Sequence, residues 1–232
     1  MANTSIASAY RRSALMTATK VTTKPPSEEV LRARDDFKDF CVFMGKAPAK
    51  HMLEWHTELC TGEDSECLLG IGGPNTSILA PRGSAKSTVL GLFAAWMIGR
   101  HAAAKQMLRI LYIAYMVDIS RAKSATIKGI LTSNKYREVF PMVRLSKIKR
   151  SDEYWSIDYE FAGIDTAGEE AFTIACGGLK GAITSKRSQL VLIDDPIKSA
   201  ASINNPDIRR EMEQTWSNVI APTMFQGARA IC

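Results

Sequence analysis

Two apolar runs, each followed by a short polar cluster, dominate the pattern of hydrophobic and polar positions along the chain. Residues 76–80 predict a short buried strand, which leads through a loop into the apolar stretch 89–99. That stretch is apolar on every face, as expected for a helix packed under a sheet. The second run, 189–193, is continuous and predicts a central parallel strand that stops at two acids.

The rest of the chain alternates between strand-like and helix-like patterns. Ser27 is a candidate N-cap for a first helix, because Glu28 and Glu29 follow it. Further helices are predicted over 49–60, 118–132 and 206–220, and further strands over 109–114, 153–161, 171–175 and 228–232, of which 153–161 and 171–175 form a more exposed hairpin. This alternation predicts an α/β fold with a doubly wound, mainly parallel sheet flanked by helices. In such folds the ligand site lies at the carboxyl ends of the strands.

The loop between the first strand and its helix has the chemistry of a phosphate-binding turn. A small-residue turn at a helix N-terminus exposes backbone N–H groups to phosphate oxygens. Lys86 would place its charge between the β- and γ-phosphates, and the Ser87 hydroxyl would bind Mg²⁺. The expected phosphate-binding residues are Gly83, Ser84, Ala85, Lys86, Ser87 and Thr88, of which Thr88 is expected to pack against the protein.

The match to the common phosphate-loop motif is incomplete, because its two glycines fall on Ala80 and Ala85. A positive φ at Ala85 would strain its Cβ, so we expect the loop to differ in detail from the common one. A chance basic turn is the alternative interpretation of this loop taken alone.

Two acids end the second apolar run. Asp194 would hold Mg²⁺ through water, and Asp195 would stand where a general base orients the attacking water. A turn or helix cap before Pro196 is the structural alternative for this pair. Together with the loop, the acids indicate a nucleoside triphosphatase.

Three segments together resemble the ATPase domain of the large terminase subunit of tailed double-stranded DNA bacteriophages: 47–59, the loop 81–88 and the block 181–196. The resemblance covers residues 37–232, and an arginine inside the phosphate loop, Arg82, is its most distinctive feature. It implies a P-loop NTPase fold with ATP and Mg²⁺ as cofactors. It also implies that ATP hydrolysis drives translocation of double-stranded DNA into a procapsid.

The resemblance also implies roles for single residues. Arg82 resembles the arginine that senses the γ-phosphate, and Asp195 would activate water at a position where the family usually has the longer Glu. Arg187 lies where a neighbouring subunit's arginine finger would originate. Trp55 and His56 lie where adenine-contacting segments occur, although simple core packing is an equal alternative for Trp55.

The implied partners are duplex DNA, a portal protein, a small terminase subunit and further copies of the chain in a ring, in the host cell cytoplasm. In the family a coupling motif and a nuclease domain follow the ATPase. We therefore expect 28–232 to be a C-terminally incomplete ATPase domain without nuclease activity. Two alternatives are an assembly module that binds ATP and DNA without turnover and a helicase-like DNA translocase.

Length and composition fit one globular enzyme domain, since the chain has 232 residues, 46% of them hydrophobic and 23% charged. The longest apolar run, 89–98, is far shorter than the roughly 20 residues that cross a bilayer, so no membrane partner is expected. Five cysteines without a C-x-x-C pair argue against a disulfide framework or a zinc site. Residues 1–27 are basic and lack acids; a flexible tail is favoured over a transit peptide.

Basic residues concentrate in one segment. The whole chain has a formal net charge of +6, whereas 121–150 holds nine basic residues and one acid. Such a concentration is typical of contact with a phosphate backbone, with a solvated basic face as the alternative. The candidate DNA-binding residues are Lys123, Lys128, Lys147, Lys149 and Arg150.

Overall fold

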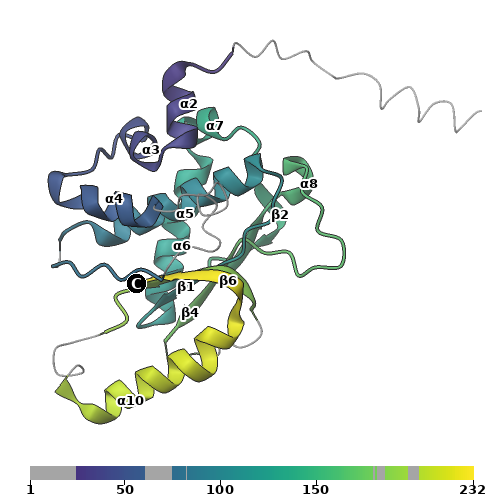
Figure 1. Ribbon diagram of the computed structural model, residues 1–232. Helices are drawn as coiled ribbons and strands as arrows, with labels where there is room; N and C mark the ends of the chain where they lie inside the picture. Colours follow the sequence, from purple (N-terminus) through teal and green to yellow (C-terminus); the bar gives the residue numbers. More distant parts are fainter. Residues whose placement is uncertain (1–24, 61–74, 82, 180, 182–185, 198–203) are drawn as a thin grey trace, which may run out of the picture.

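The computed structural model describes residues 25–60, 75–81, 83–179, 181, 186–197 and 204–232. It is an α/β structure in which helices flank a six-stranded mixed sheet (Figure 1). The strand order is β2-β3-β4-β1-β5-β6. The strands are β1 Ile110–Ala114, β2 Leu145–Arg150, β3 Tyr154–Ile157, β4 Ile174–Gly178, β5 Ser188–Asp194 and β6 Met224–Ile231.

The helices divide between the two faces of the sheet. The longest are α5, α6 and α10, and α10 continues directly into the π-helical turn η3. The helical segments are α2 Glu28–Asp35, α3 Phe37–Phe43, η1 Lys50–Met52, α4 Leu53–Cys60, α5 Lys86–Ala103, α6 Val117–Thr132, α7 Asn134–Val139, α8 Tyr159–Ala162, α10 Pro206–Thr215, η3 Trp216–Ile220 and η4 Ala221–Thr223. None of these described helices is long and apolar enough to span a membrane.

Four neighbouring strands run parallel. β1 pairs with β4 on one side and with β5 on the other, and β5 pairs with β6. In the register of these strands, Ala114 lies beside both Gly178 and Asp194, so three strands end at one level. β2 and β3 add an antiparallel edge. The predicted parallel strands over 109–114 and 189–193 are thus confirmed.

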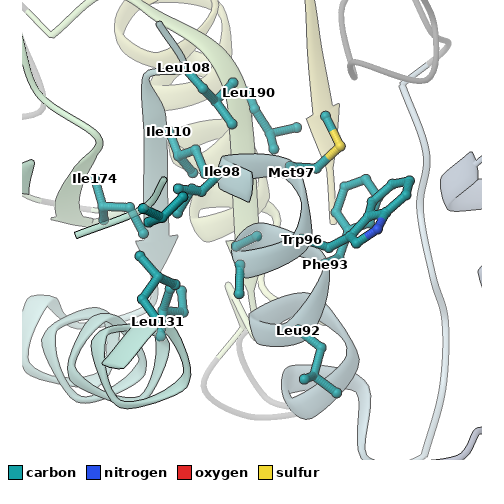
Figure 2. Packing of buried hydrophobic residues seen from close by; sticks show 14 of the residues in the cluster. Leu92, Phe93, Trp96, Met97, Ile98, Leu108, Ile110, Leu131, Ile174 and Leu190 are labelled. Carbon is teal, nitrogen blue, oxygen red and sulfur yellow. The ribbon is translucent and has the colours of Figure 1, made fainter. Parts of the chain in front are cut away.

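Helix α5 fills the main core on one face of the sheet. Its residues from Val89 to Gly99 are all buried, which confirms the prediction of an all-round apolar helix. Figure 2 shows its side chains, among them Trp96, Met97 and Ile98, in one cluster with residues of β1, β4 and β5. Each large apolar side chain buried there contributes about 1.5–3 kcal/mol relative to exposure. A smaller cluster joins the other face of the sheet to η3 and the end of α10.

The segment before the loop lies beside β6, at the margin of the sheet. Thr76 forms a parallel bridge with Ile231, but no strand extends over 76–80. The prediction of a buried strand is therefore only partly right: Ile78 is buried, whereas Leu79 is 93% exposed. Successive side chains of an extended segment point to opposite faces, and only the face that carries Ile78 is covered.

The predicted exposed hairpin is wrong in two respects. The strand expected over 153–161 ends at Ile157, because the Asp158 side chain accepts a hydrogen bond from the Phe161 N–H and starts α8. The paired strands are also interior: Trp155 is 1% exposed, and β4 lies between β3 and β1. The antiparallel pairing of the two segments is confirmed, and so is a strand in part of each, over Tyr154–Ile157 and from Ile174 onward.

The remaining predictions concern three helices and the last strand. Ser27 is the N-cap of α2, and its hydroxyl accepts a hydrogen bond from the Val30 N–H at 3.4 Å. The helix predicted over 118–132 is confirmed as α6, and the strand predicted over 228–232 begins earlier, as β6. The single helix predicted over 206–220 instead changes to π-helical geometry at Trp216.

Candidate active site

The loop 81–88 joins the segment beside β6 to the N-terminus of α5. Thr76 donates its N–H to Ala230 O at 2.9 Å, and Ile78 donates its N–H to Cys232 O at 2.6 Å. These bonds tie the start of the loop to the carboxyl end of β6, which is also the end at which β5 reaches Asp194. The loop and the two acids therefore meet at the carboxyl ends of β5 and β6.

The loop turns through left-handed backbone conformations. Gly83 has φ 83°, and Ala85, the N-cap of α5, has φ 62° and ψ 19°. Ala85 thus adopts the positive φ for which the sequence predicted a penalty, at a strain cost of roughly 1–2 kcal/mol. No side chain caps α5, so the N–H groups of its first turn face the loop without a capping oxygen. This helix end favours an anion.

Four side chains connect the loop to the strand ends. Lys86 Nζ lies 2.9 Å from Asp195 Oδ1. Ser87 Oγ donates a hydrogen bond to Asp194 Oδ1 at 2.9 Å, across 107 positions of sequence. On its other oxygen, Oδ2, Asp194 accepts a hydrogen bond from Tyr112 OH at 3.1 Å. The sequence predicted that Lys86, Ser87, Asp194 and Asp195 share a site, and the structure brings them together.

The two acids differ in their surroundings. Asp194 is 1% exposed, and both of its carboxylate oxygens accept hydrogen bonds. The Asp195 side chain is 67% exposed, and the backbone of this residue has φ 46°. The pKa of Tyr112 is raised well above its ordinary value, first by burial and then by the Asp194 carboxylate. Tyr112 therefore stays a neutral hydrogen-bond donor that fixes Asp194.

A pocket of about 280 Å³ opens in front of these groups. Its lining consists of Ala80, Pro81, residues 83–88 and Asp195. Thr88 is exposed and lines the pocket, so the prediction that it packs inside the protein is wrong. The Lys86 side chain is only 18% exposed and is paired with Asp195. The lining can accept an anion at the helix end and at Lys86.

The donor set fits Mg²⁺. Ser87 Oγ and Asp194 Oδ1 are hard oxygen donors within hydrogen-bond distance of each other. Mg²⁺ is commonly held by one or two carboxylates together with substrate phosphates and water. Ser87 and Asp194 are thus the described residues that would hold the ion.

The structure does not bring the predicted adenine contacts to this pocket. His56 is 5% exposed and stacks on Phe37 with ring centroids 4.6 Å apart, and burial lowers its pKa. Trp55 packs against the main core and makes an edge contact with His51 at 5.6 Å. Neither ring lines the pocket, which favours core packing for both. Arg82 lies outside the described residues.

Arg187 lies at the opposite end of β5 from the two acids. Its guanidinium sits 4.8 Å from the centre of the Phe225 ring. Seven residue steps along an extended strand span about 23 Å. Arg187 therefore cannot reach the pocket of its own chain.

The five candidate DNA-binding residues have different environments. Lys128 forms an ion pair with Asp152 at 2.8 Å, and Lys149 donates a hydrogen bond to Ala171 O at 2.6 Å. Lys147 and Arg150 are exposed, and Lys123 is half-buried. Lys128 is thus engaged in holding α6 to the loop before β3.

Tyr112 is a site residue that the sequence did not reveal. It stands within an apolar strand where it is indistinguishable from a core aromatic residue, and only the pairing of β1 with β5 shows its role.

No model of a known protein family matches the chain, and no curated protein is significantly similar to it.

Proposed function

We propose that this chain is an Mg²⁺-dependent ATP hydrolase of the P-loop NTPase class. One observation carries the proposal: consecutive residues of the loop, Lys86 and Ser87, contact consecutive acids at the end of β5. A turn could place a lysine near an acid by chance. Here two such contacts occur side by side. Lys86 is available for phosphate, Ser87 and the buried Asp194 for the metal, and the exposed Asp195 for water.

Binding begins at the end of α5. A triphosphate enters with its terminal phosphates against the first-turn N–H groups and Lys86. The incoming anion competes with the Asp195 carboxylate for the lysine charge, because both need the same Nζ. Asp195 is released from the ion pair and remains at the exposed rim of the pocket.

Hydrolysis then divides the work between the two acids. When bound, Mg²⁺ would neutralise charge on the phosphate oxygens, held by Ser87 and Asp194. Tyr112 keeps Asp194 in place through its second oxygen. Asp195, free and exposed, accepts a proton from the attacking water as general base.

The resemblance to large terminase subunits extends the proposal to coupling. ATP hydrolysis would drive translocation of duplex DNA, in a ring of chains on a portal protein.

A specific observation favours the alternative, a module that binds ATP and DNA without turnover. Asp195 is shorter than the usual Glu and pairs with Lys86, so its carboxylate has farther to reach.

Phosphate release from ATP tests the proposal with one substitution and a matched control. Lys86→Ala should lower the steady-state rate by about 100-fold or more, because it removes a preorganised charge from the transferred phosphate. Lys38→Ala, an exposed lysine of α3, should leave the rate unchanged. Equal rates for the parent and Lys86→Ala, with unchanged circular dichroism, would refute the assignment. A parent that binds ATP without phosphate release would favour the assembly module.

A further inference from the structure

A basic pocket of about 740 Å³ lies at the β2 edge of the sheet, across the sheet from β6 and the candidate active site. Its lining residues come from the second half of α6, from α7 and the turn after it, and from β2 and β3. Its lining contains no acid and five cations, which are Lys128, Arg137, Arg144, Lys149 and Arg150. Uncompensated positive charge in a concave surface concentrates the field that attracts an anion.

Three of these five cations, Arg137, Arg144 and Arg150, are available to a ligand, because Lys149 Nζ donates a hydrogen bond to Ala171 O at 2.6 Å. Lys128 is neutralised by Asp152 and also donates hydrogen bonds to the carbonyl oxygens of Arg150 and Ser151. The other four form no ion pair with any described residue. The neighbouring Arg121, by contrast, is paired with Asp118 and Glu153. Three unpaired cations of the basic segment, Arg137, Arg144 and Arg150, therefore line this pocket.

Two of the cations are held in place before any ligand arrives. The Arg144 guanidinium lies 3.7 Å from the centre of the Phe161 ring. Arg150 Nε donates a hydrogen bond to Ser146 O at 2.9 Å. Stacking and a single backbone bond leave the outer N–H groups of both arginines free to form bidentate bonds with phosphate oxygens. Prior ordering lowers the entropy lost on binding.

The remaining lining identifies the kind of anion. No Asn or Gln lines the pocket, so its described lining lacks the paired donor and acceptor that read adenine. Its aromatic residue, Trp155, is 1% exposed and cannot serve as a stacking platform for single-stranded bases. A concave cluster of cations without an adenine reader or an exposed stacking surface suits the phosphates of a duplex backbone.

We propose that this pocket seats backbone phosphates of duplex DNA, with Arg137 and Arg144 as its principal contacts. The inference rests on the proposed function only for the choice of DNA as the polymer. It differs from the sequence-based assignment, which omitted both arginines and included Lys128.

The salt dependence of duplex binding tests the proposal. Arg137→Ala/Arg144→Ala should flatten the slope of log affinity against log salt by about two units, and weaken binding on the order of 60-fold at 0.1 M salt. The matched control is Arg209→Ala/Arg210→Ala, which removes the same charge from an exposed helix surface on α10. Binding is measured by fluorescence anisotropy on two unrelated duplex sequences, and both should weaken alike.

Three results would overturn the proposal: a parent chain that does not bind duplex, an equal change in the control, or an unchanged slope in the pocket variant. Tripolyphosphate that displaces duplex at equal phosphate concentration, and protects Arg137 and Arg144 from an arginine-specific reagent equally well, would assign the pocket to a free polyphosphate instead. Basal ATP hydrolysis should be unchanged in both double variants. A parent that binds duplex but releases no phosphate would therefore refute the ATPase and leave the pocket standing.

Discussion

Ala85 and Asp195 hold left-handed backbone conformations on two sides of the same pocket. Both residues have a Cβ, so both conformations are strained. They flank Lys86, whose charge pairs with Asp195 across the pocket. Strain is concentrated where the loop must turn its N–H groups and its lysine toward one point, a frequent property of functional sites.

Substitution of Ala85 measures this strain. Ala85→Gly should stabilise the fold by about 1 kcal/mol, because glycine adopts φ 62° without a steric penalty. Ala122→Gly, the same change at an exposed position of α6, should destabilise by about 1 kcal/mol. Urea denaturation of both variants checks the opposite signs. A loss of stability in both would show that the loop is not strained at Ala85.

The residues of the site could be predicted because the signals are local. A glycine-containing turn before Lys86 and Ser87, and an apolar strand that ends at two acids, are each visible in a short stretch of sequence. The contacts of Tyr112 with Asp194 depend on strand order and were not predictable. The same holds for His56, whose burial comes from stacking on Phe37.

At the scale of elements, the predictions succeeded where a pattern repeats over many residues. α5, α6 and β5 are long or uniformly apolar, and their types were predicted correctly. β2 was missed, because half of its sequence LSKIKR is basic and its Ile148 is 92% exposed. Edge strands tolerate such sequences, since charged side chains protect an open edge.

One buried arginine connects three elements behind the loop. Arg229 of β6 is fully buried, and it donates hydrogen bonds to Glu58 O and Leu59 O at the end of α4. It also donates a hydrogen bond to Thr76 Oγ1 at 2.8 Å. These bonds satisfy carbonyl groups that a helix end otherwise leaves open.

Arg229→Met should therefore destabilise the fold by about 2 kcal/mol or more, because it leaves buried carbonyl groups without donors. Arg209→Met, at an exposed position of α10, should change stability by less than about 0.5 kcal/mol. The free energy of unfolding in urea distinguishes them. Similar values for the two variants would mean that these bonds contribute little beyond the exchange for water.

At the scale of the whole molecule, the sheet separates three chemical surfaces. The candidate active site lies at the carboxyl end of β5, and Arg187 lies at the amino end of the same strand. The basic pocket occupies the far edge at β2. Arg187 can therefore act on a bound triphosphate only from another copy of the chain.

Mixing of variants tests this action between subunits. Arg187→Ala should lower turnover of assembled protein by about 10³-fold, the range for arginine fingers, and should leave the unassembled chain unaffected. A mixture with Lys86→Ala should regain part of the activity, because the two defects can then fall in different sites. Confirmed mixed assemblies that regain no turnover would leave Arg187 with a structural role on Phe225.

The division of labour between the two acids is tested most directly by Asp195→Asn, with ATP affinity and phosphate release measured on the same preparation. The amide keeps the shape of the side chain but loses its charge, so Lys86 is freed from its ion pair while the general base is lost. We expect ATP affinity equal to or tighter than that of the parent, and phosphate release slower by about 100-fold or more. Loss of ATP binding, or turnover at the parent rate, would contradict it.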